Sequence, residues 1–194
     1  MLEVLFLGTG AGAPSRQSGL SSVAIRKGRD ICLFDCGEGT QRQLMISPFS
    51  FMKIKAVMIS HLHGDHFLGL PGLLLTMGIS GRTEPITVVG PAGIESVLVP
   101  IIEACGDELP YELTVTEAGD GSVFDMGNMT VSVFETVHTV TSVGYVLSEK
   151  DRYRADPSKI SELNVKSKDV EKILKGETIN GITAEDISSG TVKG

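Results

Sequence analysis

The chain has 194 residues, of which 41% are hydrophobic and 21% are charged, so it can bury a core and forms one domain or at most two. Its net charge of −7 argues against a general nucleic-acid binder, and any basic surface must be local. No apolar run is long enough to span a bilayer, and the N-terminus lacks the basic region of a signal peptide. Three cysteines without a Cys-x-x-Cys spacing argue against a disulfide framework and predict a cytoplasmic location.

Predicted strands alternate with predicted helices along the chain up to residue 148. Each strand is a short apolar run, and each helix has apolar residues at helical spacing. Thr40 and Gln43 have the spacing of a capping box that opens a short helix, which Pro48 ends. This order favours sheets covered by helices. The other predicted helices cover 67–77 and 91–105, and the predicted strands cover 3–7, 23–26, 31–35, 56–60, 86–89, 111–118, 122–126, 129–137 and 143–148.

The composition changes after Ser148. Residues 149–175 carry many charges of both signs and few apolar residues, which predicts an extended arm or a small helical excursion. We therefore expect an N-terminal part over 1–148, a charged arm or excursion over 149–185, and the start of a further segment over 186–194.

The loop after the first predicted strand is rich in glycine. Gly8-x-Gly10-x-x-Ala13 formally matches the dinucleotide-binding fingerprint, which requires a helix directly afterwards. The following residues, 14–19, cannot supply that helix, so the match is weak. Two interpretations remain. The loop is either a tight turn with positive φ at its glycines, or it passes close to a ligand with Ser15 and Arg16 directed toward it.

The strongest chemical signal is His61-x-His63-x-Asp65-His66, which lies between a predicted strand and a predicted helix. Imidazole and carboxylate groups suit zinc and other first-row divalent metals. His61 and His63 can face one ion, and Asp65 and His66 can face a second. Two ions about 3.5–4 Å apart would hold the attacking and leaving oxygens of a phosphodiester. The structural alternative is a solvated polar turn that starts a helix.

Two further residues could complete this site. His138 closes an apolar predicted strand, and with His61 and His63 it would give one metal three imidazoles and an open position for water. The metal would lower the pKa of that water to about 7. Asp35 ends another apolar strand, where it either forms a turn or accepts a hydrogen bond that orients a ligating histidine.

These residues resemble the metallo-β-lactamase superfamily, and within it the tRNase Z family of tRNA 3′-processing endoribonucleases. The superfamily motif His-x-His-x-Asp-His stands at 61–66, and the likeness to tRNase Z covers about residues 2–148. The strings that carry it are Phe6-Leu7-Gly8-Thr9-Gly10 with Pro14-Ser15-Arg16, Asp35-Cys36-Gly37-Glu38-Gly39-Thr40-Gln41-Arg42-Gln43-Leu44, Ser60 to His66 with Gly69-Leu70-Pro71-Gly72, Gly90-Pro91-Ala92-Gly93-Ile94, and His138 before Gly144-Tyr145.

The resemblance implies an αβ/βα sandwich with a dinuclear zinc site. It implies removal of the 3′ trailer from precursor tRNA, by attack of a metal-bound hydroxide on the phosphodiester after the discriminator base, with Asp65 as the candidate proton acceptor. It also implies a homodimer, no membrane association, and an arm that grips the tRNA, whose place residues 149–185 take. The implied ligands are His61, His63 and His138 for one zinc ion, and Asp65 and His66 for the other.

The chain departs from the family in two ways. Asn164-Val165-Lys166-Ser167-Lys168 stands where the arm often has a Gly/Pro-rich segment, and no histidine follows His138 to supply the family's late ligand. We therefore expect only the N-terminal half to two-thirds of the fold, an incomplete second zinc site and an uncovered apolar face. The alternatives are another phosphodiesterase or hydrolase of the same fold, or an inactive fragment without the second metal's full ligand set, because fold alone does not decide function.

Overall fold

The computed structural model of the chain describes residues 2–106, 108–127 and 129–193. These form two compact units, one of residues 1–126 with 131–146 and the other of residues 127–130 with 147–194. Among the described residues, no helix combines the length and the apolar character that a bilayer crossing requires.

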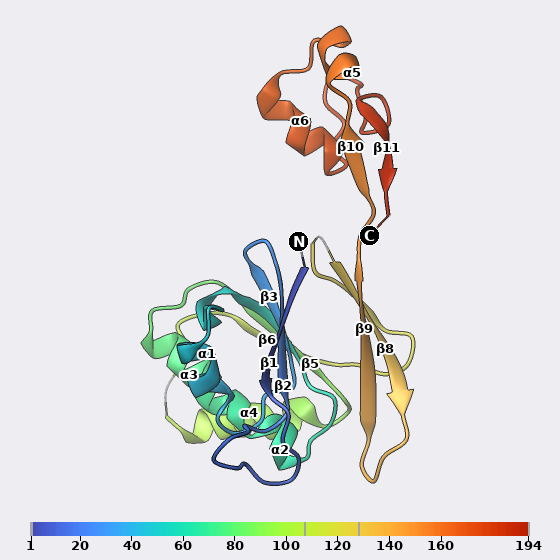
Figure 1. Ribbon diagram of the computed structural model, residues 1–194. Coiled ribbons are helices and arrows are strands. Elements are labelled where there is room, and N and C mark those ends of the chain that lie inside the picture. The colour runs from blue at the N-terminus through green and yellow to red at the C-terminus, as the bar shows by residue number, and fades with distance from the viewer. Residues whose placement is uncertain (1, 107, 128, 194) are drawn as a thin grey trace. The chain divides into compact units, whose positions relative to one another are not determined.

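The first unit is built on a six-stranded mixed sheet (Figure 1), and the hydrogen bonds between its strands give them chain order across the sheet. The first three strands pair antiparallel, and the third to the sixth pair parallel. Parallel neighbours require a crossover connection, which helices supply here. The strands are β1 (Leu2–Gly8), β2 (Ser22–Lys27), β3 (Asp30–Phe34), β4 (Ile54–Met58), β5 (Ile86–Gly90) and β6 (Leu113–Glu117).

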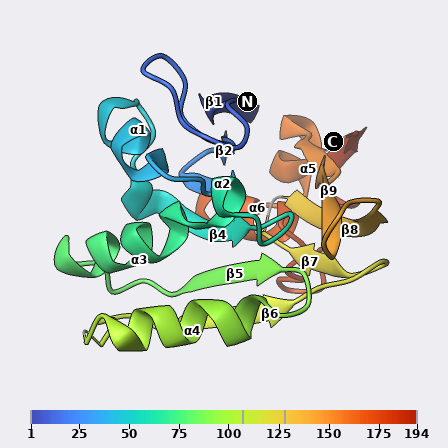
Figure 2. The same ribbon diagram turned by 90° about the horizontal axis from the view of Figure 1, so that it is seen from below.

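Helices cover one face of this sheet (Figures 1 and 2). Leu33, Val57 and Val88 of the sheet are fully buried and pack in one core with Leu70 and Leu73 of a helix. β1 contributes Leu7 to this core, while its alternate residues Val4 and Phe6 are 51% and 68% exposed. The helices are α1 (Thr40–Ile46), the 3-10 helix η1 (Phe51–Lys53), α2 (Gly64–Phe67), α3 (Gly69–Ile79) and α4 (Ile94–Ala104).

A three-stranded sheet lies on the opposite side, with β7 (Val123–Asp125), β8 (Met129–Thr136) and β9 (Ser142–Glu149) in that order. The hydroxyl of Tyr145 donates to the carbonyl oxygen of Ile59 over 2.8 Å. The amide of Val143 donates to the carbonyl oxygen of Ser60 over 2.9 Å. These bonds fix β9 against the end of β4, directly beside the histidine motif.

Arg82 binds the backbone at the end of the sheet where β4 and β5 begin. Its side chain is buried, and burial lowers the pKa of its guanidinium group. A buried cation is costly unless its donors are satisfied, and here the acceptors are backbone carbonyls at 2.7–3.2 Å. These carbonyls belong to Met52, Ile54, Glu84 and Pro85. The cation therefore ties together the segments that begin β4 and β5.

The second unit contains a strand pair and two helices. Asp156 caps the first helix, because its carboxylate accepts the amides of Ser158 and Lys159 at 2.9 and 3.4 Å. Ile173 and Ile187 are buried in a small core. The predicted arm or helical excursion is therefore a small folded unit. Its elements are β10 (Arg152–Ala155), α5 (Pro157–Glu162), α6 (Ser167–Leu174) and β11 (Ser188–Val192), which pairs antiparallel with β10.

All the strands and helices predicted up to residue 148 are confirmed, with ends that shift by up to three residues. The predicted capping box is wrong. Gly39, at φ 88°, precedes α1, and Thr40 is already the first helical residue, so no side chain caps the helix. The Thr40 side chain is instead buried. Gly39 in the left-handed conformation therefore starts the helix at the point where the sequence predicted a capping hydroxyl.

Candidate metal centre

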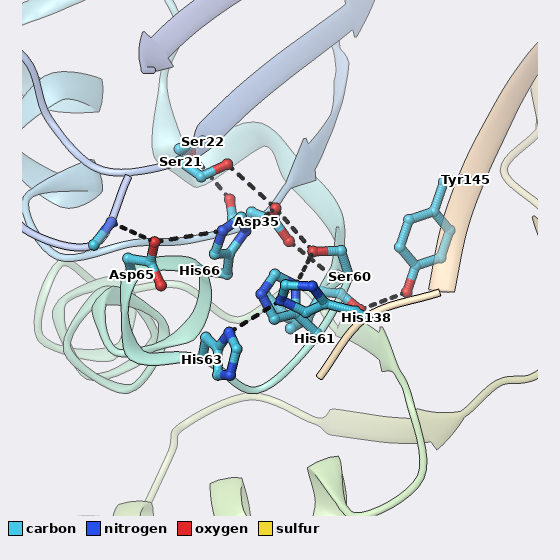
Figure 3. A network of polar contacts seen from close by, with 12 residues as sticks. Ser21, Ser22, Asp35, Ser60, His61, His63, Asp65, His66, His138 and Tyr145 are labelled. Atoms are coloured by element: carbon cyan, nitrogen blue, oxygen red, sulfur yellow. Dashed lines mark hydrogen bonds and ion pairs between the residues drawn. The ribbon is translucent and has the colours of Figure 1, made fainter. Parts of the chain in front are cut away.

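The candidate site lies where the parallel strands β3 and β4 end (Figure 3). Phe34 and Met58, the last residues of the two strands, are register partners, so the segments that follow leave the sheet side by side. Asp35 begins one of these segments, and Ser60 and His61 belong to the other. Open α/β sheets bind ligands at this edge, outside the carboxyl ends of their strands.

Three imidazoles converge here from two distant parts of the chain. Ring nitrogens of His61, His63 and His138 all lie within 4.8 Å of one another, and Nε2 of His138 is 3.2 Å from Nδ1 of His63. The turn between β8 and β9 carries His138, and a backbone bridge between His61 and Ser142 holds that turn against the motif. Three imidazoles suit zinc and other first-row divalent ions, so the cluster can hold a metal ion.

The environment of His61 favours the form that binds metals. Its side chain is buried, and burial lowers the pKa of the imidazole, as do the neighbouring histidines. A neutral imidazole keeps a lone pair for a metal ion, whereas a protonated one has none. His61 therefore presents a ready ligand at neutral pH.

Asp65 and His66 lie beside the three imidazoles on α2. The ring centroids of His66 and His61 are 4.1 Å apart, and Nε2 of His66 is 3.6 Å from Oδ2 of Asp65. The amide of Gly12 donates to the same Oδ2 over 2.7 Å, and this bond lowers the pKa of Asp65. Asp65 is therefore ionised at neutral pH and can act as a ligand or accept a proton.

Asp35 sits behind the motif at φ 57°, an unusual backbone conformation for a residue other than glycine. Its carboxylate Oδ2 is 2.6 Å from Nδ1 of His66, and its Oδ1 accepts the amide of Ser60 over 2.8 Å. The hydrogen bond to Asp35 raises the pKa of His66. The structure places Asp35 where it would orient His66 with Nε2 free, as the sequence hypothesis requires.

The glycine loop reaches this site through its backbone. Gly12, at φ 72°, provides the amide that binds Asp65, so the interpretation of a turn with positive φ at a glycine is confirmed, and the approach of Ser15 and Arg16 to a ligand stays a prediction. Ser15 and Arg16 are exposed further along the loop, and the Ser15 hydroxyl accepts the amide of Ser18 over 3.0 Å. β2 follows the loop, where a dinucleotide site would need a helix.

Sequence reasoning missed the close backbone approach behind the motif. The amide of Cys36 donates to the carbonyl oxygen of His66 over 2.7 Å. A Cβ atom at Gly37 would lie 2.2 Å from the carbonyl oxygen of Asp65 and 2.5 Å from Cβ of Leu20. Only glycine fits there. In the sequence, the one indication of this close contact was a glycine two residues after Asp35.

Sequence reasoning also missed the two hydroxyls that hold the turn carrying His138. The hydroxyls of Thr136 and Ser142 are 2.7 Å apart, and that of Ser142 donates to the carbonyl oxygen of Thr136 over 3.1 Å. His138 itself is exposed, and these two hydrogen bonds hold the base of the turn that carries it.

A pocket of about 680 Å³ opens beside His138, at the carboxyl ends of β5 and β6. Ala92 and Val143 supply apolar parts of its lining, and Glu117 supplies an acidic part. The Glu117 carboxylate accepts the amide of Gly93 over 2.7 Å at the start of α4. The pocket thus leaves His138 accessible from the side of β5 and β6.

Comparisons with known proteins agree with this geometry. The family described as Anti-Pycsar protein Apyc1 matches residues 2–180. Ribonuclease Z of Bacillus velezensis is 39% identical over 183 aligned positions, which cover 92% of this chain and 59% of that protein. The short form of human tRNase Z matches with a TM-score of 0.69 and 36% identity, over 77% of this chain and 65% of that one.

A further solved structure has the same fold. The metallo-β-lactamase fold protein YhfI from Bacillus subtilis matches with a TM-score of 0.57 and 20% identity, over 83% of this chain and 67% of that one. The chain spans 58–61% of the length of three curated ribonuclease Z relatives that it matches.

The packing of Gly37 predicts a metal-binding defect at a residue that touches no metal. Gly37→Ala should weaken Zn²⁺ binding by about tenfold or more, because the new methyl group displaces the backbone of Asp65 and the adjoining histidine. Isothermal titration with Zn²⁺ measures the change. Gly119→Ala is the control, since a Cβ atom there meets nothing within 4 Å. Equal affinities for the two variants would contradict this account.

Proposed function

The chain belongs to the family described as Anti-Pycsar protein Apyc1 and is a homologue of ribonuclease Z with the metallo-β-lactamase fold, and from this premise we propose that it provides the metal site of a zinc-dependent endoribonuclease that removes the 3′ trailer from precursor tRNA. One observation carries the proposal, namely the convergence of three imidazoles beside Asp65 and His66 in a chain 39% identical to ribonuclease Z.

Zinc is the metal that we propose, because imidazoles and a carboxylate match its preferences. When bound, zinc would activate water and neutralise the charge that develops on the phosphate oxygens. The cluster of His61, His63 and His138 would hold one ion, and Asp65 and His66 would hold the second. Among the described residues the first site has more ligands, so we expect it to bind zinc more tightly.

Asp65 is the proposed acceptor of the proton that the attacking water loses. The Gly12 amide fixes its Oδ2 and keeps the carboxylate ionised, so Asp65 enters the reaction able to take up a proton. The water oxygen would bond to phosphorus while the bond from phosphorus to the ribose 3′ oxygen breaks, and the released 3′ oxygen would take up a proton from solvent. The products would be a tRNA with a free 3′ hydroxyl and a trailer with a 5′ phosphate.

Two variants separate binding of the first zinc ion from the roles of Asp65. His63→Ala should lower the zinc content and abolish cleavage, because it removes one imidazole of the cluster. Asp65→Ala should keep the first zinc ion while cleavage falls by at least about 100-fold, as expected when a catalytic proton acceptor is lost. Elemental analysis gives the zinc content per chain, and cleavage of a precursor tRNA with a 3′ trailer gives the activity.

Hydrolysis assays with two substrates, together with the zinc content, distinguish the competing functions. Hydrolysis of bis(p-nitrophenyl) phosphate without cleavage of precursor tRNA would favour another phosphodiesterase of this fold. Bound zinc without hydrolysis of either substrate would favour an inactive fragment. Full cleavage by Asp65→Ala would overturn the proposed role of that residue.

We also propose that Ser15 and Arg16 contact phosphates of the RNA. Both are exposed on the loop whose Gly12 amide binds Asp65, so a strand bound to the loop would pass near the catalytic carboxylate. Arginine suits phosphate contacts because its donors match the oxygens of the group.

Arg16→Ala should raise KM for precursor tRNA several-fold at low salt and leave kcat nearly unchanged. The difference from the unmodified chain should shrink as salt increases, because a phosphate contact releases counterions. Steady-state kinetics at two salt concentrations test this, with Arg29→Ala in the exposed β2–β3 turn as the control. An unchanged KM would make Arg16 an ordinary surface residue.

For the domains, we propose a catalytic part over 1–148 and a tRNA-contacting arm over 149–185, the region that the second unit contains. The exposed bases Arg152, Arg154 and Lys168 within the second unit support the contact with tRNA. We also propose a cytoplasmic location, which the free cysteines Cys32, Cys36 and Cys105 favour.

A homodimer is the proposed assembly, and a groove between α1 and α3 offers a surface for it. Met45 and Leu68 line the groove and are 53% and 60% exposed. Glu38 and Arg42 place opposite charges on the same lining, so a twofold axis at the groove would let each charge face its opposite on a second copy.

Met45→Glu should convert the dimer to a monomer, because the new carboxylate would be buried at the contact. Val97→Glu on α4 is the control, since Val97 is also an exposed apolar residue on a helix of the same unit. Analytical ultracentrifugation measures the mass. A mass of 20.6 kDa, that of a single unmodified chain, would exclude the dimer.

A further inference from the structure

A serine hydroxyl connects one of the candidate metal ligands to the carboxylate behind the site (Figure 3). Oγ of Ser60 lies 2.9 Å from Nδ1 of His61 and 3.0 Å from Oδ2 of Asp35. The backbone amide of Ser60 donates to the other oxygen of the same carboxylate over 2.8 Å. Asp35 therefore holds both the backbone and the side chain of Ser60.

The chemistry of the three groups fixes the direction of these hydrogen bonds. An ionised carboxylate only accepts, so the single hydroxyl proton of Ser60 is donated to Asp35. The hydroxyl oxygen can then accept a hydrogen bond from His61, which requires the ring proton to be on Nδ1. The lone pair of His61 is left on Nε2, the nitrogen available to a metal ion.

The same carboxylate also binds a second ring of the motif. Oδ2 of Asp35 is 2.6 Å from Nδ1 of His66, so one side chain orients His66 directly and His61 through Ser60. Ser21 donates to this Oδ2 as well, over 3.3 Å. Ser21 therefore serves as a reference hydroxyl, which contacts the same oxygen from a different segment of the chain.

We propose that Ser60 is a positioning residue that sets the tautomer of His61 and thereby the affinity of the His61, His63 and His138 cluster for a divalent metal ion. The inference rests on the proposed metal function and deepens it. Partners of this kind raise the affinity of a site because the ligand does not have to change its tautomer or orientation when the ion arrives.

The test compares three variants with the unmodified chain, with Zn²⁺ as the probe in competition with a chromogenic chelator. Ser60→Ala should raise the Kd for the first Zn²⁺ by about 10- to 100-fold. Ser60→Thr keeps the hydroxyl and should restore most of the affinity. Ser21→Ala removes a hydroxyl from the same carboxylate oxygen and should change the Kd by about twofold or less.

A second measurement follows the ring itself in the zinc-free protein. The ¹⁵N chemical shifts of His61 should show the proton on Nδ1 in the unmodified chain and in Ser60→Thr, and a mixture of tautomers in Ser60→Ala. This readout does not depend on activity, and far-UV circular dichroism shows whether each variant is folded. If Ser60→Ala only lowered the stability of the fold, the proton of His61 would stay on Nδ1 in that variant.

The outcomes separate the inference from the function on which it rests. If the unmodified chain binds no Zn²⁺, the proposed function and the role of Ser60 both fail. If it binds Zn²⁺ and Ser60→Ala binds equally well, or Ser21→Ala loses as much affinity, the role of Ser60 alone is overturned. A proton on Nε2 of His61 in the unmodified chain would also overturn it.

Discussion

The arrangement of the metal centre depends on the carboxylate of Asp35 and on the backbone that presents it. At φ 57° this residue occupies the left-handed region, which costs a residue other than glycine about 1–3 kcal/mol. The hydrogen bonds that Asp35 accepts from Ser60 and shares with His66 offset that cost. They also join the segment after β4 to α2, so one side chain connects the parts of the chain that would hold metal ions.

Close backbone packing makes this connection possible. A Cβ atom at Gly69 would lie 2.2 Å from the carbonyl oxygen of Gly37. The amide of Gly69 donates to the carbonyl oxygen of Cys36 over 2.9 Å. Glycines at these positions let the segment after β3 lie directly against α2 and the start of α3. The parallel pairing of β3 and β4 brings the two segments to the same edge of the sheet, so the fold and the site share one geometric cause.

How far the sequence predicts this structure depends on the range of the interactions involved. Local patterns predicted the elements, and the motif at 61–66 with the strings around it predicted a metallo-β-lactamase fold and a resemblance to tRNase Z, both of which are confirmed. The capping box failed because Thr40 turns into the core, which no local pattern reveals. The contacts of Gly12 and Ser60 escaped prediction because they join residues that are distant in the sequence.

The most direct test of this account is X-ray absorption spectroscopy at the zinc edge, on the chain loaded with one equivalent of Zn²⁺. The account predicts three imidazole nitrogens at about 2.0–2.1 Å, and one imidazole fewer in His138→Ala, since that residue completes the cluster. A sulfur ligand at about 2.3 Å, or an identical spectrum for His138→Ala, would contradict the claim that these three histidines form the metal site.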